Sequence, residues 1–289
     1  QVDVLHYTPE SRASLCYVDA SHPGRPRRLY AKTFCDEQGS AIHQRFVYFW
    51  SLAQRDGDAP RVAQPLGYDP QTRTVWQREV VGESLIDVMC GGAETDWLRG
   101  VAAAMAAVHR APMALAAGRH RDVGHWCDEL WRRARKVSRA APELADQVSE
   151  VVQRLVRTGQ QLPACEQTLI HGDCHPGQFL VAQGRPVLFD FDEFACGDPM
   201  EDLAEFLVKL DPVTRARSGE ALAQAYRQAH PAGFDPRRLQ WHEAVQQLLQ
   251  ACRAFTFQVP QWRLAMAQRL AQAQGLAQAL EQPRIGAHP

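Results

Sequence analysis

The chain of 289 residues has few lysines and lacks the common nucleotide-binding signatures. Lys32, Lys136 and Lys209 are its three lysines among 32 basic residues, and all the others are arginine. Neither G-x-x-x-x-G-K-[ST] nor G-x-G-x-x-G occurs, which argues against a P-loop nucleoside triphosphatase and against a dinucleotide-binding fold. Long apolar runs and a signal-peptide pattern are also missing, so the sequence predicts no membrane partner.

The cysteines and the net charge exclude further classes. The eight cysteines are scattered, without a C-x-x-C pair or the paired spacing of a zinc site. Unpaired thiols in a chain of this length are typical of the cytoplasm, and we expect a cytoplasmic protein. A net charge of −1 provides no field that would attract nucleic acid, so we expect no nucleic-acid partner.

What the chain does contain is two acidic loops joined by a short hairpin. Phe179–Val181 and Val187–Phe189 are β-prone apolar runs, and Gln183-Gly184 between them suits a tight turn. Because the two strands of a hairpin run antiparallel, the residues before the first and after the second emerge at the same end. The spacing therefore predicts that Asp173 and Asp190 are neighbours.

Two carboxylates at one end of a hairpin favour phosphoryl transfer. One can orient an attacking hydroxyl and accept its proton, while the other holds Mg²⁺, a hard cation that keeps phosphate oxygens among its ligands. Kinases divide the work in this way, because their catalysis consists mainly of positioning and charge neutralisation. The pattern indicates a phosphotransferase.

The spacing of the flanking residues carries a family resemblance. His171-Gly172-Asp173, His175 and Gln178 follow the pattern H-G-D-x-H-x-x-N, apart from the last position. The residues that follow the pattern I-D-[FW]-[DE]-x-A…G-D-P…D-L-A are Asp190, Phe191, Asp192, Ala195, Gly197, Asp198, Pro199, Asp202, Leu203 and Ala204. With these residues the segment from His171 to Leu207 resembles the aminoglycoside phosphotransferase and choline kinase superfamily.

The resemblance implies an α+β, bilobal, protein-kinase-like fold. Residues 1–82 would form a small β-rich lobe that binds the nucleotide, and residues 83–289 a larger, mainly helical lobe for catalysis and acceptor binding. The implied activity transfers the γ-phosphate of ATP or GTP to a hydroxyl group of a small-molecule acceptor, with Mg²⁺ as cofactor.

The resemblance also implies roles for residues of the large lobe. Asp173 would be the catalytic base and His175 would orient its loop. Asp190 would be a Mg²⁺ ligand, with Asp192 as a weaker second candidate and Gln178 in the place of a metal-ligating Asn. Asp198 and Asp202 are expected to be structural.

In the small lobe we expect Lys32 to bind phosphate. A compact ammonium suits a point contact with phosphate better than a forked guanidinium; the alternative is a solvated lysine on an edge strand. Glu79 and Val81 belong to a stretch that resembles the family's hinge, whose backbone would hydrogen-bond the base. The segment Ser21–Pro26 either covers the phosphates or is a plain turn.

Two departures from the family pattern favour an alternative. Gln178 is one methylene longer than the family's Asn, and the predicted helix Ser40–Gln54 has no acid to pair with Lys32, so that Gln44 is the expected substitute. A pseudokinase that binds nucleotide or a partner with weak or no turnover is therefore the second hypothesis. A metal-dependent hydrolase built on His171 and His175 is a minor third, because the glycines and the proline beside them disfavour a helix.

The remaining pattern predicts the secondary structure and narrows the acceptor. Strands are expected at Ser14–Val18, Arg28–Phe34 and Arg73–Val80. Helices are expected at Ser40–Gln54, around Leu98–His109 and Leu144–Leu155, after Asp198-Pro199, and at about Gly219–His230, Pro236–Gln258 and Trp262–Leu280. The family builds its acceptor pocket from the C-terminal helices, and Glu243 is the one acid of Pro236–Leu280. This composition argues mildly against a polycationic acceptor and for a neutral or anionic one.

Overall fold

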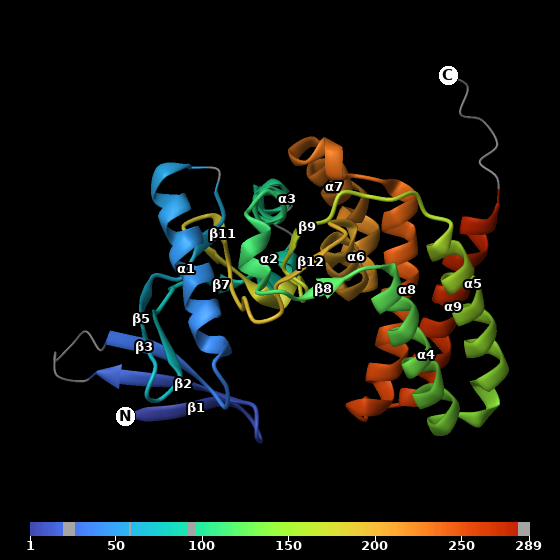
Figure 1. Ribbon diagram of the computed structural model, residues 1–289, viewed down its shortest axis with the longest axis horizontal. Helices are drawn as coiled ribbons and strands as arrows, with labels where there is room; N and C mark the ends of the chain where they lie inside the picture. Colours follow the sequence, from blue (N-terminus) through green and yellow to red (C-terminus); the bar gives the residue numbers. More distant parts are fainter. Residues whose placement is uncertain (20–26, 58, 92–95, 283–289) are drawn as a thin grey trace.

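A computed structural model describes residues 1–19, 27–57, 59–91 and 96–282, which form a β-rich lobe beside a larger helical lobe (Figure 1). The predicted bilobal, protein-kinase-like α+β fold is confirmed. The segment Ser21–Pro26, predicted as a phosphate cover or a turn, lies outside the described residues.

The small lobe is built on an antiparallel sheet with the strand order β1-β2-β3-β6-β5. Its strands are β1 (Val2–Thr8), β2 (Arg12–Asp19), β3 (Arg27–Phe34), β5 (Pro65–Asp69) and β6 (Thr74–Arg78). The predicted hairpin of β2 and β3 is confirmed, with Ser14 opposite Lys32. Because β3 lies in the middle of the sheet, Lys32 is not an edge-strand lysine. β1 has exposed apolar side chains, and its alternation of apolar and polar residues slips by one place after Val4, so the sequence pattern missed it.

Helix α1 (Gln38–Arg55) joins the small lobe to the centre of the molecule. Ile42, Phe46 and Phe49 are buried on one face, at the three- and four-residue steps of an amphipathic helix. The ring of Phe46 stacks on Phe191 with centroids 4.4 Å apart, and Phe191 belongs to the acidic loop after the predicted hairpin of Phe179–Phe189. Packing of α1 therefore fixes that loop against the small lobe.

The predicted central hairpin is confirmed as β10 (Phe179–Ala182) and β11 (Arg185–Leu188). Gln183 and Gly184 both have positive φ, 54° and 72°, as a tight two-residue hairpin turn requires. β4 (Arg61–Val62) and β7 (Glu83–Ser84) complete this sheet in the order β4-β11-β10-β7. A second small sheet has the order β8-β12-β9, formed by His120–Arg121, Ala195–Gly197 and Thr168–Ile170.

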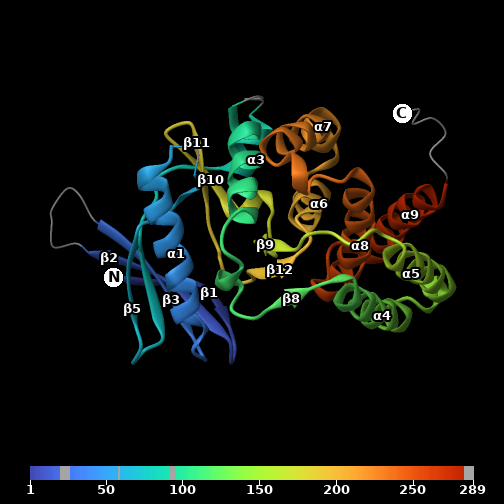
Figure 2. The ribbon, with the colours of Figure 1, turned by 45° about the horizontal axis from the view of Figure 1, so that its top comes forward.

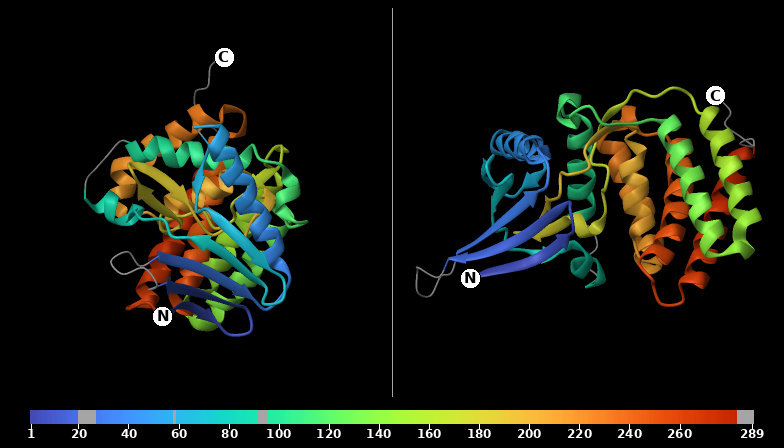
Figure 3. Two further views of the ribbon diagram at one scale, coloured as in Figure 1. Left: turned by 90° about the vertical axis from the view of Figure 1, so that its left-hand side faces the viewer. Right: turned by 60° about the horizontal axis from the view of Figure 1, so that its bottom comes forward.

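The helices of the large lobe form two groups (Figures 2 and 3). The central group contains α2 (Leu85–Cys90), α3 (Asp96–His109), α6 (Met200–Lys209) and α7 (Pro212–Ala229), and the distal group contains α4 (Val123–Ala140), α5 (Ala145–Gln160), α8 (Pro236–Thr256) and α9 (Trp262–Glu281). Short 3₁₀ turns are η1 (Met113–Ala116), η2 (Pro142–Leu144), η3 (Pro176–Gln178) and η4 (Pro231–Gly233). Helix α7 begins well before the predicted Gly219, because Asp211 caps it and Pro212 occupies its first turn.

Two hydrophobic cores hold these groups together. One extends from Phe34 and Phe46 of the small lobe to Phe206 and Leu222 of the central helices. The other lies among the four distal helices.

Strand β4, from the predicted small lobe, pairs with β11 of the large one. A lobe boundary at Gly82 stays a prediction. Within the described residues, every helix is too short or too polar to cross a membrane.

Candidate active site

The hairpin turns two of the predicted residues toward one cavity. Gln178 directly precedes β10 and Asp190 follows β11, and the Phe189 N–H donates to the Gln178 carbonyl at 2.9 Å. Asp190 has a φ of +59°, in the left-handed region that Asp tolerates better than most residues. The backbone at Asp190 is thus held in an uncommon conformation, as is frequent where a side chain must be aimed at a functional site.

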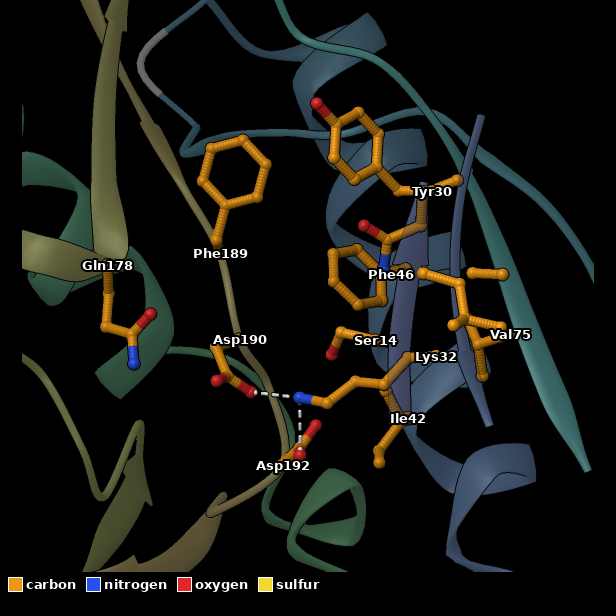
Figure 4. Close-up of a pocket in the computed structure, with 13 residues that line it drawn as sticks. Ser14, Tyr30, Lys32, Ile42, Phe46, Val75, Gln178, Phe189, Asp190 and Asp192 are labelled. Carbon is orange, nitrogen blue, oxygen red and sulfur yellow. Dashed lines mark hydrogen bonds and ion pairs between the residues drawn. The ribbon is translucent and has the colours of Figure 1, made fainter. Parts of the chain in front are cut away.

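The cavity between the lobes has a volume of about 240 Å³ (Figure 4). Lys32 enters it from the sheet, with Nζ 2.8 Å from Asp190 Oδ1 and 2.6 Å from Asp192 Oδ2. The other lining residues are Ser14, Leu15, Tyr30, Ala31, Ile42, Phe46, Val75, Gln77, Gln178 and Phe189. The structure therefore brings Lys32, Gln178, Asp190 and Asp192 together, from both lobes.

Asp192 is the more enclosed of the two cavity carboxylates. Its side chain is 3% exposed, and Oδ2 also accepts from Arg12 of β2 at 2.9 Å. Burial raises its pKa to about 6, against the lowering effect of Lys32 and with a further rise from Asp190. For Asp190, burial would raise the pKa, but the Lys32 ammonium outweighs it and lowers the pKa. Asp192 Oδ1 is buried and has no hydrogen-bond partner among the described residues.

Lys32 pairs with these carboxylates in place of an acid on α1. The expected substitute, Gln44, is exposed, and it lies between the cavity-lining residues Ile42 and Phe46, on another side of the helix. That expectation was wrong, because the helical period turns position 44 away from the cavity. The polar residue that α1 buries is Arg45, which donates to the carbonyls of Leu115 and Phe191.

Asp173 lies beside the cavity and is not one of its lining residues. Gln178, which does line the cavity, is hydrogen-bonded to Asp173. The Gln178 amide Nε2 donates to Asp173 Oδ2 at 3.1 Å, and His175 Nε2 lies 3.7 Å from the same oxygen. Lys209 Nζ lies 3.0 Å from Asp173 Oδ1. Burial would raise the pKa of Asp173, but His175 and Lys209 outweigh it and hold the pKa well below its usual range. The carboxylate is ionised at neutral pH.

Lys209 and Glu205 were missed by the sequence prediction. Both belong to α6; Lys209 contacts Asp173, and its Nζ lies 2.8 Å from Glu205 Oε1. Burial raises the pKa of Glu205 to about 8, although Lys209 acts to lower it. The scarcity of lysine was the available signal, since two of the chain's three lysines contact carboxylates of this site.

Asp202 organises the backbone of the catalytic loop, as expected for a structural residue. Its carboxylate accepts from the N–H groups of His171 at 2.6 Å and Gly172 at 2.9 Å, and it contacts His109 Nε2 at 3.0 Å. Gly172 has a φ of +77°, and a Cβ there would lie 2.3 Å from the Glu193 carbonyl oxygen. The first turn of the loop therefore requires glycine.

Three arginines hold the loop carbonyls in place. Arg45 and Arg119 donate to the carbonyls of Phe191 and Asp192, and Arg121 donates to the Gly172 carbonyl at 2.7 Å. Arg121 also binds the fully buried Glu201 at 2.8 Å. A guanidinium suits this bridging because its planar fork offers several donors at once.

The predicted hinge residues lie apart from the Lys32 cavity. Glu79 and Val81 line a neighbouring cavity of about 530 Å³ behind the hinge, and Val81 is 81% exposed. The Glu79 N–H is directed at the Arg28 carbonyl at 3.4 Å. In the Lys32 cavity itself, Figure 4 places Tyr30 of β3 across from Phe189, and neither aromatic residue was predicted as part of the site.

The two histidines of the loop are bonded to different partners. His171 is buried and its Nε2 contacts the Phe189 carbonyl, whereas His175 Nδ1 accepts from the Gly177 N–H. These contacts suit residues that shape the loop. Within the parts of the chain that the structure describes, no group of three or more His, Cys, Asp or Glu side chains is arranged to hold a metal ion by itself.

Comparison with protein families and curated proteins gave one match. The model of the phosphotransferase enzyme family matches residues 51–242, two thirds of the chain. No curated protein matches the sequence.

Solved structures with the same fold cover nearly the whole chain. A thermostable mutant of aminoglycoside phosphotransferase APH(4)-Ia, in ternary complex with AMP-PNP and hygromycin B, has a TM-score of 0.66 at 16% identity, over 96% of this chain and 93% of the other. A choline/ethanolamine kinase family protein from Mesorhizobium loti has a TM-score of 0.61 at 17% identity, over 98% and 89%. A mutant of aminoglycoside 2'-phosphotransferase-IIIa in complex with GDP has a TM-score of 0.62 at 16% identity, over 96% and 92%.

Proposed function

The chain belongs to the phosphotransferase enzyme family, and from that premise we propose that it is a small-molecule kinase that transfers the γ-phosphate of ATP or GTP to an acceptor hydroxyl. The observation that carries this proposal is the position of Gln178. Its amide binds Asp173 on one side and lines the cavity of Lys32 and Asp190 on the other. A proton acceptor and a phosphate-binding cavity are thereby joined in one unit.

The donor set of the cavity fits Mg²⁺. Asp190 and Gln178 offer carboxylate and amide oxygens, and the unpartnered buried Oδ1 of Asp192 is a third oxygen. Hard oxygen ligands of this kind are those that Mg²⁺ takes in kinases, where it also keeps phosphate oxygens as ligands. A bound Mg²⁺ would neutralise charge on the nucleotide phosphates. Asp192 in addition anchors Lys32 from the large lobe.

The residues of the chain would then act on a bound nucleotide as follows. Lys32 binds a phosphate oxygen, and Asp173 accepts a hydrogen bond from the acceptor hydroxyl. The hydroxyl oxygen forms a bond to the γ-phosphorus, while the bond from that phosphorus to the β–γ bridging oxygen breaks and leaves its electron pair on the nucleoside diphosphate. Asp173 takes the hydroxyl proton and releases it to solvent. His175 holds the loop that positions Asp173.

Tyr30 and Phe189 would bind the nucleotide base. They face one another across the cavity, and aromatic rings offer sequence-tolerant stacking to any base. The backbone of Glu79 and Val81 lines a separate cavity, and it would hydrogen-bond the base only if the base extends from the Lys32 cavity to that stretch. Similar structures that contain AMP-PNP or GDP support a nucleotide as the donor. The described cysteines are free thiols, which supports a cytoplasmic location.

We propose a neutral or anionic acceptor rather than a polycation. Glu243 is the one acid of Pro236–Leu280, and it is occupied by Arg215 at 2.6 Å. The same range contains five arginines. A structure with this fold contains hygromycin B, but at 16% sequence identity the likeness supports the fold and not the identity of the acceptor.

A screen of acceptor hydroxyl compounds tests the proposal. Sugars, amino alcohols, homoserine-like amino acids and aminoglycosides would each be incubated with Mg·ATP, and ADP release would be compared with the acceptor-free rate. We expect acceptor-dependent release and a product heavier by one phosphoryl group. Stimulation by polycations alone would contradict the proposed acceptor class.

A pseudokinase is the second candidate, because Gln178 replaces Asn and Lys32 lacks an acidic partner on α1. Thermal stabilisation by ATP, measured with and without Mg²⁺, separates the two candidates. Stabilisation that ignores Mg²⁺, together with an absence of turnover on every acceptor, favours the pseudokinase. Stabilisation that requires Mg²⁺ favours the kinase.

A further inference from the structure

Lys209 binds the carboxylate that the family pattern makes the catalytic base. Its Nζ lies 3.0 Å from Asp173 Oδ1 and 2.8 Å from Glu205 Oε1. The side chain is 14% exposed and that of Glu205 5%, so this ammonium is largely desolvated. It reaches the loop from the last turn of α6, the helix whose first turn presents Asp202 to the backbone of the same loop.

The geometry leaves one donor of Lys209 available. An ammonium carries three N–H donors, and Asp173 and Glu205 use two of them. A hydroxyl hydrogen-bonded to Asp173 Oδ1, the oxygen that Lys209 contacts, would lie about 2.7 Å from that oxygen, and hence within about 6 Å of Nζ. The transferring phosphoryl group must lie against that hydroxyl, which places its oxygens within reach of the third donor.

The choice of lysine at this position is informative. Arginine supplies all but three of the chain's Lys and Arg residues, including those that bind the loop carbonyls. A compact point charge with three rotatable donors suits simultaneous contact with two carboxylates and one phosphate oxygen better than a planar fork does. Glu205 lies one helical turn before Lys209 on α6, and its carboxyl group contacts the ammonium.

We propose that Lys209, held by Glu205, is a catalytic residue that binds the γ-phosphoryl group as it moves from nucleotide to acceptor. The proposal rests on the proposed kinase function. The ammonium stabilises the charge on the equatorial phosphoryl oxygens while the bond to the bridging oxygen breaks and the bond to the acceptor oxygen forms. Lys209 gains and loses no proton, and the hydroxyl proton still passes to Asp173.

A purely structural role predicts a different behaviour. In that case Lys209 would serve only as the buried partner of Glu205 and Asp173, and its removal would lower stability without regard to the nucleotide. A contact with the γ-phosphoryl group instead distinguishes ATP from ADP, since ADP lacks that group. The ratio of the two affinities is therefore the decisive quantity.

The test compares Lys209→Met with Lys136→Met, which removes the exposed lysine of α4. Mg·ATP and Mg·ADP dissociation constants would be measured by calorimetry, and turnover with the best acceptor by ADP release. For Lys209→Met we expect the preference for ATP over ADP to fall about tenfold and kcat to fall about 100-fold, a loss typical of one donor to developing charge. Lys136→Met should match the wild type in both.

A second variant guards against misfolding. Glu205→Gln with Lys209→Met removes the ammonium and replaces its buried carboxyl partner by a neutral amide of similar size, and it should show the same loss of ATP preference. Equal changes in the ATP and ADP affinities, or no change, in a folded variant would overturn the role of Lys209. The ratio of the ATP and ADP affinities is measured without acceptor, so it does not depend on turnover. If the wild type binds nucleotide but transfers no phosphate, the proposed kinase function is wrong, and the affinity ratio still tests the contact of Lys209 with the γ-phosphoryl group.

Discussion

The ammonium of Lys32 lies 2.6 Å from the carboxylate of Asp192, so the central strand of the small lobe is tied to the acidic loop of the large lobe. Arg12 binds the same carboxylate at 2.9 Å. In a kinase that pairs its strand lysine with a helix glutamate, the position of the helix controls the lysine. In this chain the acidic loop holds it, and α1 contributes apolar contacts and Arg45.

Asp192→Ala should destabilise the protein by about 3 kcal/mol, because it removes the carboxyl group that Lys32 and Arg12 share in a buried position. Denaturant unfolding at neutral pH measures the change. The control is Glu37→Gln, which breaks the exposed ion pair with Arg73 in the same lobe and should have no measurable effect. Equal stability of Asp192→Ala and wild type would show that these contacts contribute nothing.

Asp198→Asn should cost about 2 kcal/mol at neutral pH, because Asp198 binds His242 and Arg238 of α8 and caps α6 at Met200. Burial would raise the pKa of Asp198, but these partners outweigh it and lower the pKa from 3.8 to about 2. The stabilisation is therefore present above pH 3.8 and is lost as the pH falls through 2. Denaturant midpoints of variant and wild type should converge toward pH 2. A gap that persists there would contradict the assignment.

Glu205→Gln should flatten the pH dependence of stability. Burial raises the pKa of Glu205 from 4.5 to about 8, although Lys209 acts to lower it, and Asp173 and Glu201 add to the rise. Between these pH values the folded protein keeps a proton that the unfolded chain has released, so stability falls as the pH rises. The free energy of unfolding, followed from pH 5 to 8, should fall less steeply in the variant. Parallel curves would show that Glu205 is ionised throughout.

Gln178→Asn should reduce turnover about tenfold, because the shorter amide cannot both bind Asp173 and line the nucleotide cavity in the present backbone. The measurement is kcat at saturating Mg·ATP, with Gln178→Ala as the lower reference. A large gain for Gln178→Asn would mean instead that the native loop is handicapped, and would favour the pseudokinase hypothesis.

The sequence was informative where local pattern determines structure. The Gln183-Gly184 turn predicted the hairpin, and from it we predicted that Asp173 and Asp190 would be neighbours. Asp190 lines the cavity, whereas Asp173 lies beside it and is connected to it through Gln178. Lys32, expected at the site because a compact ammonium suits a phosphate contact, does contact Asp190. The partners of Lys32 and Asp173 could not be predicted, because tertiary packing determines which faces of α1 and α6 are turned toward the site. On α1, Gln44 was the predicted partner of Lys32, but its side chain is exposed. On α6, Lys209 is the partner of Asp173, although it lies 36 residues away in the sequence.

In the proposed reaction, Asp173 accepts the proton of the acceptor hydroxyl beside a nucleotide held by Lys32 and Asp190. Acceptor-dependent ADP release and Mg·ATP affinity, measured together for wild type, Asp173→Asn and Asp190→Asn, test it most directly. We predict that Asp173→Asn abolishes release with a Kd for Mg·ATP within about twofold of wild type, whereas Asp190→Asn loses both release and affinity. Equal acceptor-dependent release by wild type and Asp173→Asn would contradict the account.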